Sequence, residues 1–198
     1  MSLFQKLERL SWLFVVLSTS FFFLGISRIA NAWQSELFGS NRLLEISGLT
    51  NDATAFSLPL IFFVFLSLSL RWMLSLVYEG QASEGIVPDR AELREMLALA
   101  FLPMLLFSAF YYMNLLFCDA SFQSLQDLKK HSFFFGLGFD DFRRLGWVCR
   151  LAVYGILVLL LHRRKGLAIG RAVLVTCLPS LILFGFQQLF SLLLERTV

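Results

Sequence analysis

Charged residues are scarce in this sequence, and their scarcity excludes a soluble globular domain. Only 16% of the 198 residues are Asp, Glu, Lys or Arg, whereas 58% are hydrophobic and 23 are Phe. A soluble domain of this size has about a quarter of its residues charged, because its surface must meet water. The composition is typical of a multi-pass membrane protein, whose outer surface meets lipid. We therefore predict an all-α fold, a polytopic membrane helical bundle.

Cysteine and histidine are also few, and no catalytic motif is present. Cys118, Cys149 and Cys177 are far apart and show neither a disulfide framework nor metal-ligand spacing. The two histidines, His131 and His162, are predicted on opposite sides of the membrane. The sequence contains no HExxH zinc motif, no GxSxG elbow and no phosphate-binding GxxxxGK[ST] loop. These absences predict a protein that is not an enzyme and that has no metal or other cofactor.

The sequence does contain long hydrophobic runs, and about 20 apolar residues suffice to cross roughly 30 Å of hydrocarbon. We predict a single membrane domain, residues 1–198, with five transmembrane helices at about 11–29, 55–72, 94–118, 145–162 and 171–194. The third run has a helix start signal, because Asp89 can cap a helix and Glu92 follows three residues later. Residues 30–54 and 119–144 are expected as the outer loops.

Lys and Arg in short loops predict the orientation. Their count on the two sides is nine against eight, so the number alone does not decide it. The last loop does, because it holds four basic residues and no acidic one: Arg163, Arg164, Lys165 and Arg171. We predict the bacterial cytoplasmic (inner) membrane, with this loop and the N-terminus in the cytoplasm and the C-terminus outside. The four basic side chains are candidate contacts for lipid headgroups, and the net charge of +3 does not imply nucleic acid.

Two segments allow two interpretations each. The basic start, the first apolar run and Ala30-Asn31-Ala32 imitate a signal peptide, although we interpret the run as a retained helix. Residues 119–144 combine apolar side chains at a spacing of three with the cluster Phe133-Phe134-Phe135. This segment is expected either as a short helix in the membrane interface or as a loop packed over the bundle.

The few polar side chains inside the predicted helices are candidates for contacts within the membrane. Arg150 lies about five residues inside the fourth helix, where it either snorkels to the interface or holds an ion or a lipid headgroup. Asn114, Gln187 and Gln188 can form hydrogen bonds between helices. No acidic side chain lies deep in any predicted helix, which counts against autonomous ion-driven transport.

Prolines and one acidic pair carry weaker signals. Pro103 and Pro179 are predicted to kink their helices, which either opens a crevice or eases packing. Asp140 and Asp141 precede an apolar run, so a role at a helix start is favoured over a cation site.

The arrangement of these features resembles the Yip (Ypt/Rab-interacting protein) domain family. The resemblance is carried by five predicted spans, by residues 92–105, ELREMLALAFLPML, at the third span, and by the small basic turn at residues 165–173, KGLAIGRAV. It covers roughly residues 10–195, and the short segment before the first span is similar to the compact prokaryotic members. The resemblance implies a membrane protein without catalytic residues, of a kind considered alongside transport machinery.

We therefore predict a non-enzymatic organising or accessory subunit of a membrane complex. Its predicted partners are membrane lipids and other integral membrane subunits or a second copy of the chain. The alternative is a permease subunit that forms a solute or lipid path together with partner chains. The alternative requires Arg150, Asn114 and Gln187 to converge on one cavity.

Overall fold

The computed structural model of the chain describes residues 3–39, 41–78, 88–118, 127, 131–133 and 136–195. Over these residues the protein is all-helical, as predicted, and its five long helices are α1 (Leu3–Phe38), α2 (Arg42–Tyr78), α3 (Arg90–Leu116), α5 (Phe139–Lys165) and α6 (Ile169–Glu195).

Four of these helices are long and apolar enough to cross a membrane, namely Ser11–Phe38, Arg42–Val77, Arg90–Leu116 and Phe139–Lys165. In α6 the apolar segment among the described side chains is Ile169–Ile182. The crossing of the membrane by α6 therefore stays a prediction.

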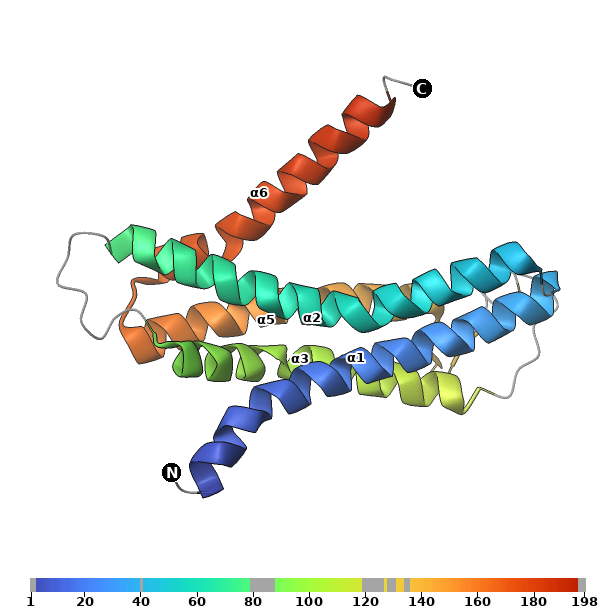
Figure 1. Ribbon diagram of the computed structural model, residues 1–198, viewed down its shortest axis with the longest axis horizontal. Coiled ribbons are helices and arrows are strands. Elements are labelled where there is room, and N and C mark those ends of the chain that lie inside the picture. Colours follow the sequence, from blue (N-terminus) through green and yellow to red (C-terminus); the bar gives the residue numbers. More distant parts are fainter. Residues whose placement is uncertain are drawn as a thin grey trace.

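The first two helices are longer than a membrane is thick. The 36 residues of α1 and the 37 of α2 extend about 54 and 55 Å, against roughly 30 Å of hydrocarbon. The expectation of an outer loop at residues 30–54 was wrong, because both helices continue through this polar segment and reverse near Gly39 and Asn41. The hairpin projects past the ends of α3 and α5 (Figure 1).

The helices α1, α2, α3 and α5 form a bundle. α1 packs against α2 and α3, and α3 packs against α5 and less extensively against α2. The ring centroids of Phe62 of α2 and Tyr154 of α5 lie 6.2 Å apart. α6 packs against α5 and α2 and then leaves the bundle diagonally (Figure 1). We name the end of the bundle where α3 begins and α5 ends the clamped end, and the opposite end, with the α1–α2 turn, the hairpin end.

The densest packing lies toward the clamped end. Side chains of three helices are almost completely buried there: Leu66, Leu70 and Leu74 of α2, Met96, Leu97 and Ala100 of α3, and Leu157 and Leu161 of α5. Within a membrane, such close contact stabilises helices through dispersion rather than through removal of apolar surface from water. The clamped end is therefore the part of the bundle in which packing specifies the structure.

Helix starts follow the predicted acidic signals. The Asp89 carboxylate accepts the backbone N–H of Glu92 at 2.6 Å and caps α3, which confirms the sequence prediction. The N-cap of α5 is Gly138, and its backbone N–H donates to Asp141 at 2.9 Å. Asp140 pairs with Arg143 at 3.0 Å. Both acidic residues thus serve the start of α5.

The turn between α5 and α6 is short and internally bonded. Gly166 ends α5 with φ of 66°, a left-handed conformation that glycine adopts at little cost. Nδ1 of His162 lies 2.7 Å from the carbonyl oxygen of Leu167, and since a carbonyl can only accept, this nitrogen donates. These bonds fix the base of α6 against the end of α5.

Candidate functional site

A cavity of about 330 Å³ lies in the middle of the bundle, beside the packed core of the clamped end. All four bundle helices contribute to its lining, which consists of Thr19, Phe23, Ala55, Leu58, Pro59, Phe62, Phe101, Met104, Trp147, Arg150, Leu151 and Tyr154. The lining is mainly apolar and aromatic, as is usual for sites that bind small molecules or lipids. The cavity lies where α2 and α5 do not pack closely against each other.

Arg150 is the one charged residue of this lining. Its guanidinium carbon lies 5.1 Å from the centroid of the Trp147 ring, a cation–π contact. The ion pairs that the structure shows among its described residues join other partners, so Arg150 has no acidic neighbour there. A positive charge at the level of predicted hydrocarbon is costly unless something pairs with it.

The other polar groups at the cavity already have partners. The Tyr154 hydroxyl lies 2.8 Å from the Ser180 hydroxyl, which links α5 to α6. The Thr19 hydroxyl donates to the Val15 carbonyl at 2.7 Å within α1. Arg150 is therefore the group at this cavity with donors to spare.

The structure separates residues that the permease alternative would bring together. Asn114 is buried in α3, where its amide donates to the Phe110 carbonyl at 2.8 Å and its side-chain oxygen has no partner. It does not line the cavity of Arg150. Gln187 and Gln188 lie in α6, but their side chains are outside the described residues. Pro103 and Pro179 lie inside α3 and α6, which continue as helices through both.

Two of the four predicted headgroup contacts form ion pairs between helices. Arg164 donates to Glu95 at 3.0 Å, and Lys165 pairs with Glu92, so the end of α5 is fastened to the start of α3. Arg163 and Arg171 are exposed. Sequence reasoning treated the acidic start of α3 and the basic end of α5 separately, although their opposite charges at one side of the membrane are a signal for this pairing.

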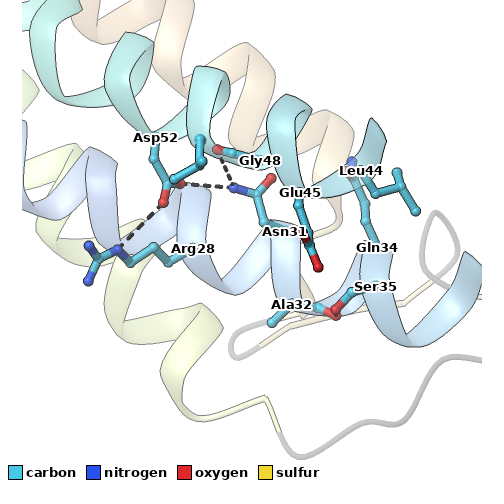
Figure 2. Close-up of a pocket in the computed structure, with 10 residues that line it drawn as sticks. Arg28, Asn31, Ala32, Gln34, Ser35, Leu44, Glu45, Gly48 and Asp52 are labelled. Carbon is cyan, nitrogen blue, oxygen red and sulfur yellow. Dashed lines mark hydrogen bonds and ion pairs between the residues drawn. The ribbon is translucent and has the colours of Figure 1, made fainter. Parts of the chain in front are cut away.

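A second polar group, which the sequence analysis missed, fastens the α1–α2 hairpin (Figure 2). Asp52 of α2 accepts hydrogen bonds from Ser27 at 2.7 Å and from the Asn31 amide at 2.9 Å, and Arg28 lies 3.5 Å from its other oxygen. Asn31 also donates to the Gly48 carbonyl at 3.1 Å. A hollow of about 470 Å³ lies alongside. Since the Asp52 carboxylate is satisfied from α1, we assign it a structural role.

An aromatic cluster covers the hairpin end of α3 and α5. Phe133 is buried among Trp33, Phe139 and Phe142, with ring centroids 4.9 to 6.4 Å apart. Its neighbour His131 lies 3.5 Å from the Cys118 sulfur. The part of segment 119–144 around Phe133 thus packs over the bundle, while Phe134, Phe135 and the apolar positions of residues 119–126 lie outside the described residues.

The outer surface of the bundle is apolar. One face of α2, comprising Leu58, Ile61, Val64 and Leu68, is more than half exposed along three turns. In water such a continuous patch would be a liability, whereas in a bilayer it is the lipid-facing surface. Four spanning helices with such a surface define the class of the protein, an integral membrane protein with a helical bundle.

Comparisons of the chain with protein-family models, with curated proteins and with solved structures find no match. The resemblance to the Yip domain family therefore stays a prediction. Within the described ranges, no three His, Cys, Asp or Glu side chains gather as metal ligands.

Proposed function

We propose that the protein is a non-enzymatic organising or accessory subunit of a membrane complex, Yip-like, which acts through contacts between helices. The observation that supports this role is α6, which departs from the bundle formed by the other four helices (Figure 1). Beyond its base, α6 exposes Leu181, Ile182 and Phe184 to 63%, 46% and 57%. An apolar helix that its own chain leaves uncovered has a face available for a neighbouring membrane protein.

The base of α6 is held firmly enough to present this face. Ala172, Val175 and Thr176 are completely buried against the bundle, and Ser180 is bonded to Tyr154. Past Pro179, a Cβ at Gly185 would meet no atom within 4 Å. Small residues let two helices approach closely in a membrane, so Gly185 suits a contact with a partner helix.

Site-specific photo-crosslinking in native membranes tests this role. A photoreactive side chain at Ile182 should yield protein adducts of discrete mass, whereas one at Leu68, on the lipid-facing surface of α2, should yield lipid adducts only. The substitution Gly185→Leu should abolish the protein adducts from Ile182. Gly155→Leu is the matched control, because a Cβ there also meets no atom within 4 Å. Equal protein adducts from both crosslinking positions, or none from Ile182, would contradict the proposal.

The predicted orientation in a bacterial inner membrane belongs to this proposal. In a variant without native cysteines, Arg163→Cys should react with a membrane-impermeant thiol reagent only after the cytoplasmic face is opened. Labelling of intact cells from outside would reverse the orientation.

A second candidate function, a permease subunit that forms a lipid or solute path with partner chains, is favoured by the cavity that Arg150 lines. Reconstituted vesicles test it. Vesicles that contain the protein and its partner should move a labelled lipid or solute across the membrane, and this movement should depend on the cavity. A rate equal to that of vesicles without protein would exclude the permease function.

A further inference from the structure

The positive charge of Arg150, at the depth of its cavity, requires an anion or water to stabilise it. Arg150 lies five residues beyond Leu145, where the apolar run of α5 begins, which corresponds to about 8 Å along the helix. A guanidinium at that depth is stabilised by an anion or by water reached through snorkelling. The Trp147 ring covers one face of the guanidinium but supplies no negative charge.

The cavity opens sideways between α2 and α5, at the level of the predicted transmembrane helices. Three of its lining residues, Leu58 of α2 and Trp147 and Leu151 of α5, are 52%, 59% and 67% exposed. These large apolar side chains form the rim between two helices that do not pack closely together. A ligand that enters by this route comes from the lipid phase.

The charged residue of the cavity lies between its shallow and its deep lining. By the predicted spans, Ala55 and Trp147 lie near the membrane boundary and Phe62, Phe101 and Tyr154 lie deeper, with Arg150 between these levels on α5. From residue 147 to residue 154 the cavity follows α5 for about 10 Å. Its volume of about 330 Å³ is at the lower end of the roughly 300–1,000 Å³ typical of ligand sites, so it accommodates part of an acyl chain rather than a whole lipid.

From these observations we propose that the cavity binds one anionic phospholipid, with its phosphate on Arg150 and one acyl chain between α2 and α5. Arginine suits a phosphate because its planar group donates two parallel hydrogen bonds. A phospholipid carries both groups that the cavity requires. Its phosphate lies near the membrane boundary, and its acyl chain extends from there into the hydrocarbon. A free anion has no chain for the aromatic lining. The inference is independent of the accessory role and uses the same cavity as the permease alternative, without requiring transport.

Native mass spectrometry of the full-length protein tests the proposal. The protein is reconstituted in vesicles of equal parts phosphatidylglycerol and phosphatidylcholine, extracted in mild detergent, and its lipid adducts are counted. The wild type should retain one phosphatidylglycerol. Because charge-assisted hydrogen bonds are strong, Arg150→Gln should lower this retention about tenfold or more.

Two further variants separate the cavity from general surface attraction. Arg144→Gln is the matched control, since Arg144 is an exposed arginine of the same helix outside the cavity lining, and it should retain the lipid. Ala55→Phe keeps Arg150 but fills the outer part of the cavity, and it should lose the lipid as Arg150→Gln does. Each variant is compared at equal helicity and equal elution volume in gel filtration, and Ala55→Phe keeps the test decisive if Arg150→Gln does not fold.

Three results would overturn the proposal. Equal losses in Arg144→Gln and Arg150→Gln would indicate general attraction to the surface. Retention in Ala55→Phe would place the lipid outside the cavity, and equal retention of both lipids would exclude recognition of the charge. None of these results changes the crosslinks expected from Ile182. The lipid-binding proposal can therefore fail while the proposed accessory role stands.

Discussion

The clamped end and the hairpin end of the bundle are held together by different interactions. At the clamped end, leucines of α2 and α5 and the start of α3 pack with almost no exposed surface. At the hairpin end, α1 and α2 extend beyond the bundle and are joined by polar bonds to Asp52. The cavity lies between these two regions. Close aliphatic packing therefore dominates at the clamped end, polar bonds join the projecting part of the α1–α2 hairpin, and the cavity between these regions can hold a ligand.

The difference suggests a division of roles within one chain. A closely packed region tolerates little change of volume, so the clamped end suits a structural role. The open middle carries an unpaired charge and an apolar lining, which is the combination that binding requires. Predictions that weaken each region separately test whether this division is real.

The largest effect is expected in the packed core. Leu97, which is 0% exposed, should lose about 2 to 5 kcal/mol of unfolding free energy on substitution by alanine, because a cavity replaces its contacts. Leu151→Ala is the matched change in the open region, where the side chain is 67% exposed, and it should cost about 0.5 kcal/mol or less. Equilibrium unfolding of the detergent-solubilised protein in dodecyl sulfate measures both. Equal effects would remove the contrast between the two regions.

A second prediction concerns close packing between α1 and α3. A Cβ at Gly25 would lie 2.9 Å from Cδ2 of Tyr112 and still closer to the neighbouring ring carbon. Gly25→Ala should therefore cost about 1 to 3 kcal/mol through overpacking, measured by the same unfolding assay. Adding Tyr112→Ala should restore much of that loss.

The control for this change is Gly155→Ala, because a Cβ at Gly155 meets no atom within 4 Å. It should stabilise α5 by about 0.5 to 1 kcal/mol through helix propensity. A harmless Gly25→Ala would show that α1 and α3 separate easily. The open region would then extend beyond the space between α2 and α5.

A third prediction concerns the hairpin. Asp52→Ala removes the acceptor for Ser27, Asn31 and Arg28 and should cost about 1 to 2 kcal/mol, since the lost bonds involve a charged group. Hydrogen exchange should accelerate in the parts of α1 and α2 beyond the bundle, while amides at the clamped end stay protected. Glu45→Ala, at an exposed residue that lines the same hollow, should leave both regions unchanged. Faster exchange at the clamped end would mean that the two ends are coupled.

The sequence predicted the class of fold and one helix cap but not the length of the hairpin. Hydropathy locates apolar runs, so it ended the first helix near residue 29 although the chain stays helical to Phe38. The spacing of polar residues indicates how far the two helices of the hairpin extend. Ser27 and Asn31 are four residues apart, as are Gly48 and Asp52, and residues at this spacing lie on one face of a helix. Matching the two polar faces would have predicted the hairpin.

The site was predicted only in part, because it depends on which helices are neighbours. Sequence reasoning selected Arg150 by its charge, and the structure places it in the cavity. Its lining partners on α1, α2 and α3 follow from which helices are neighbours in the bundle, and no local pattern encodes that. Asn114 was grouped with Arg150 because both are polar, but a residue type alone does not indicate the cavity that a side chain faces.

The smallest effect is expected from the ion pairs of the clamped end. Glu95 and Arg164 are 49% and 38% exposed, so a double-mutant cycle with Glu95→Gln and Arg164→Gln should give a coupling energy of about 0.2 to 1 kcal/mol. This coupling should shrink as salt is added, because the pair is open to solvent. Arg163→Gln paired with Glu95→Gln is the control and should show no coupling. A coupling as large as the loss in Leu97→Ala would mean that charge, rather than packing, holds the clamped end, and both ends of the bundle would then depend on polar interactions.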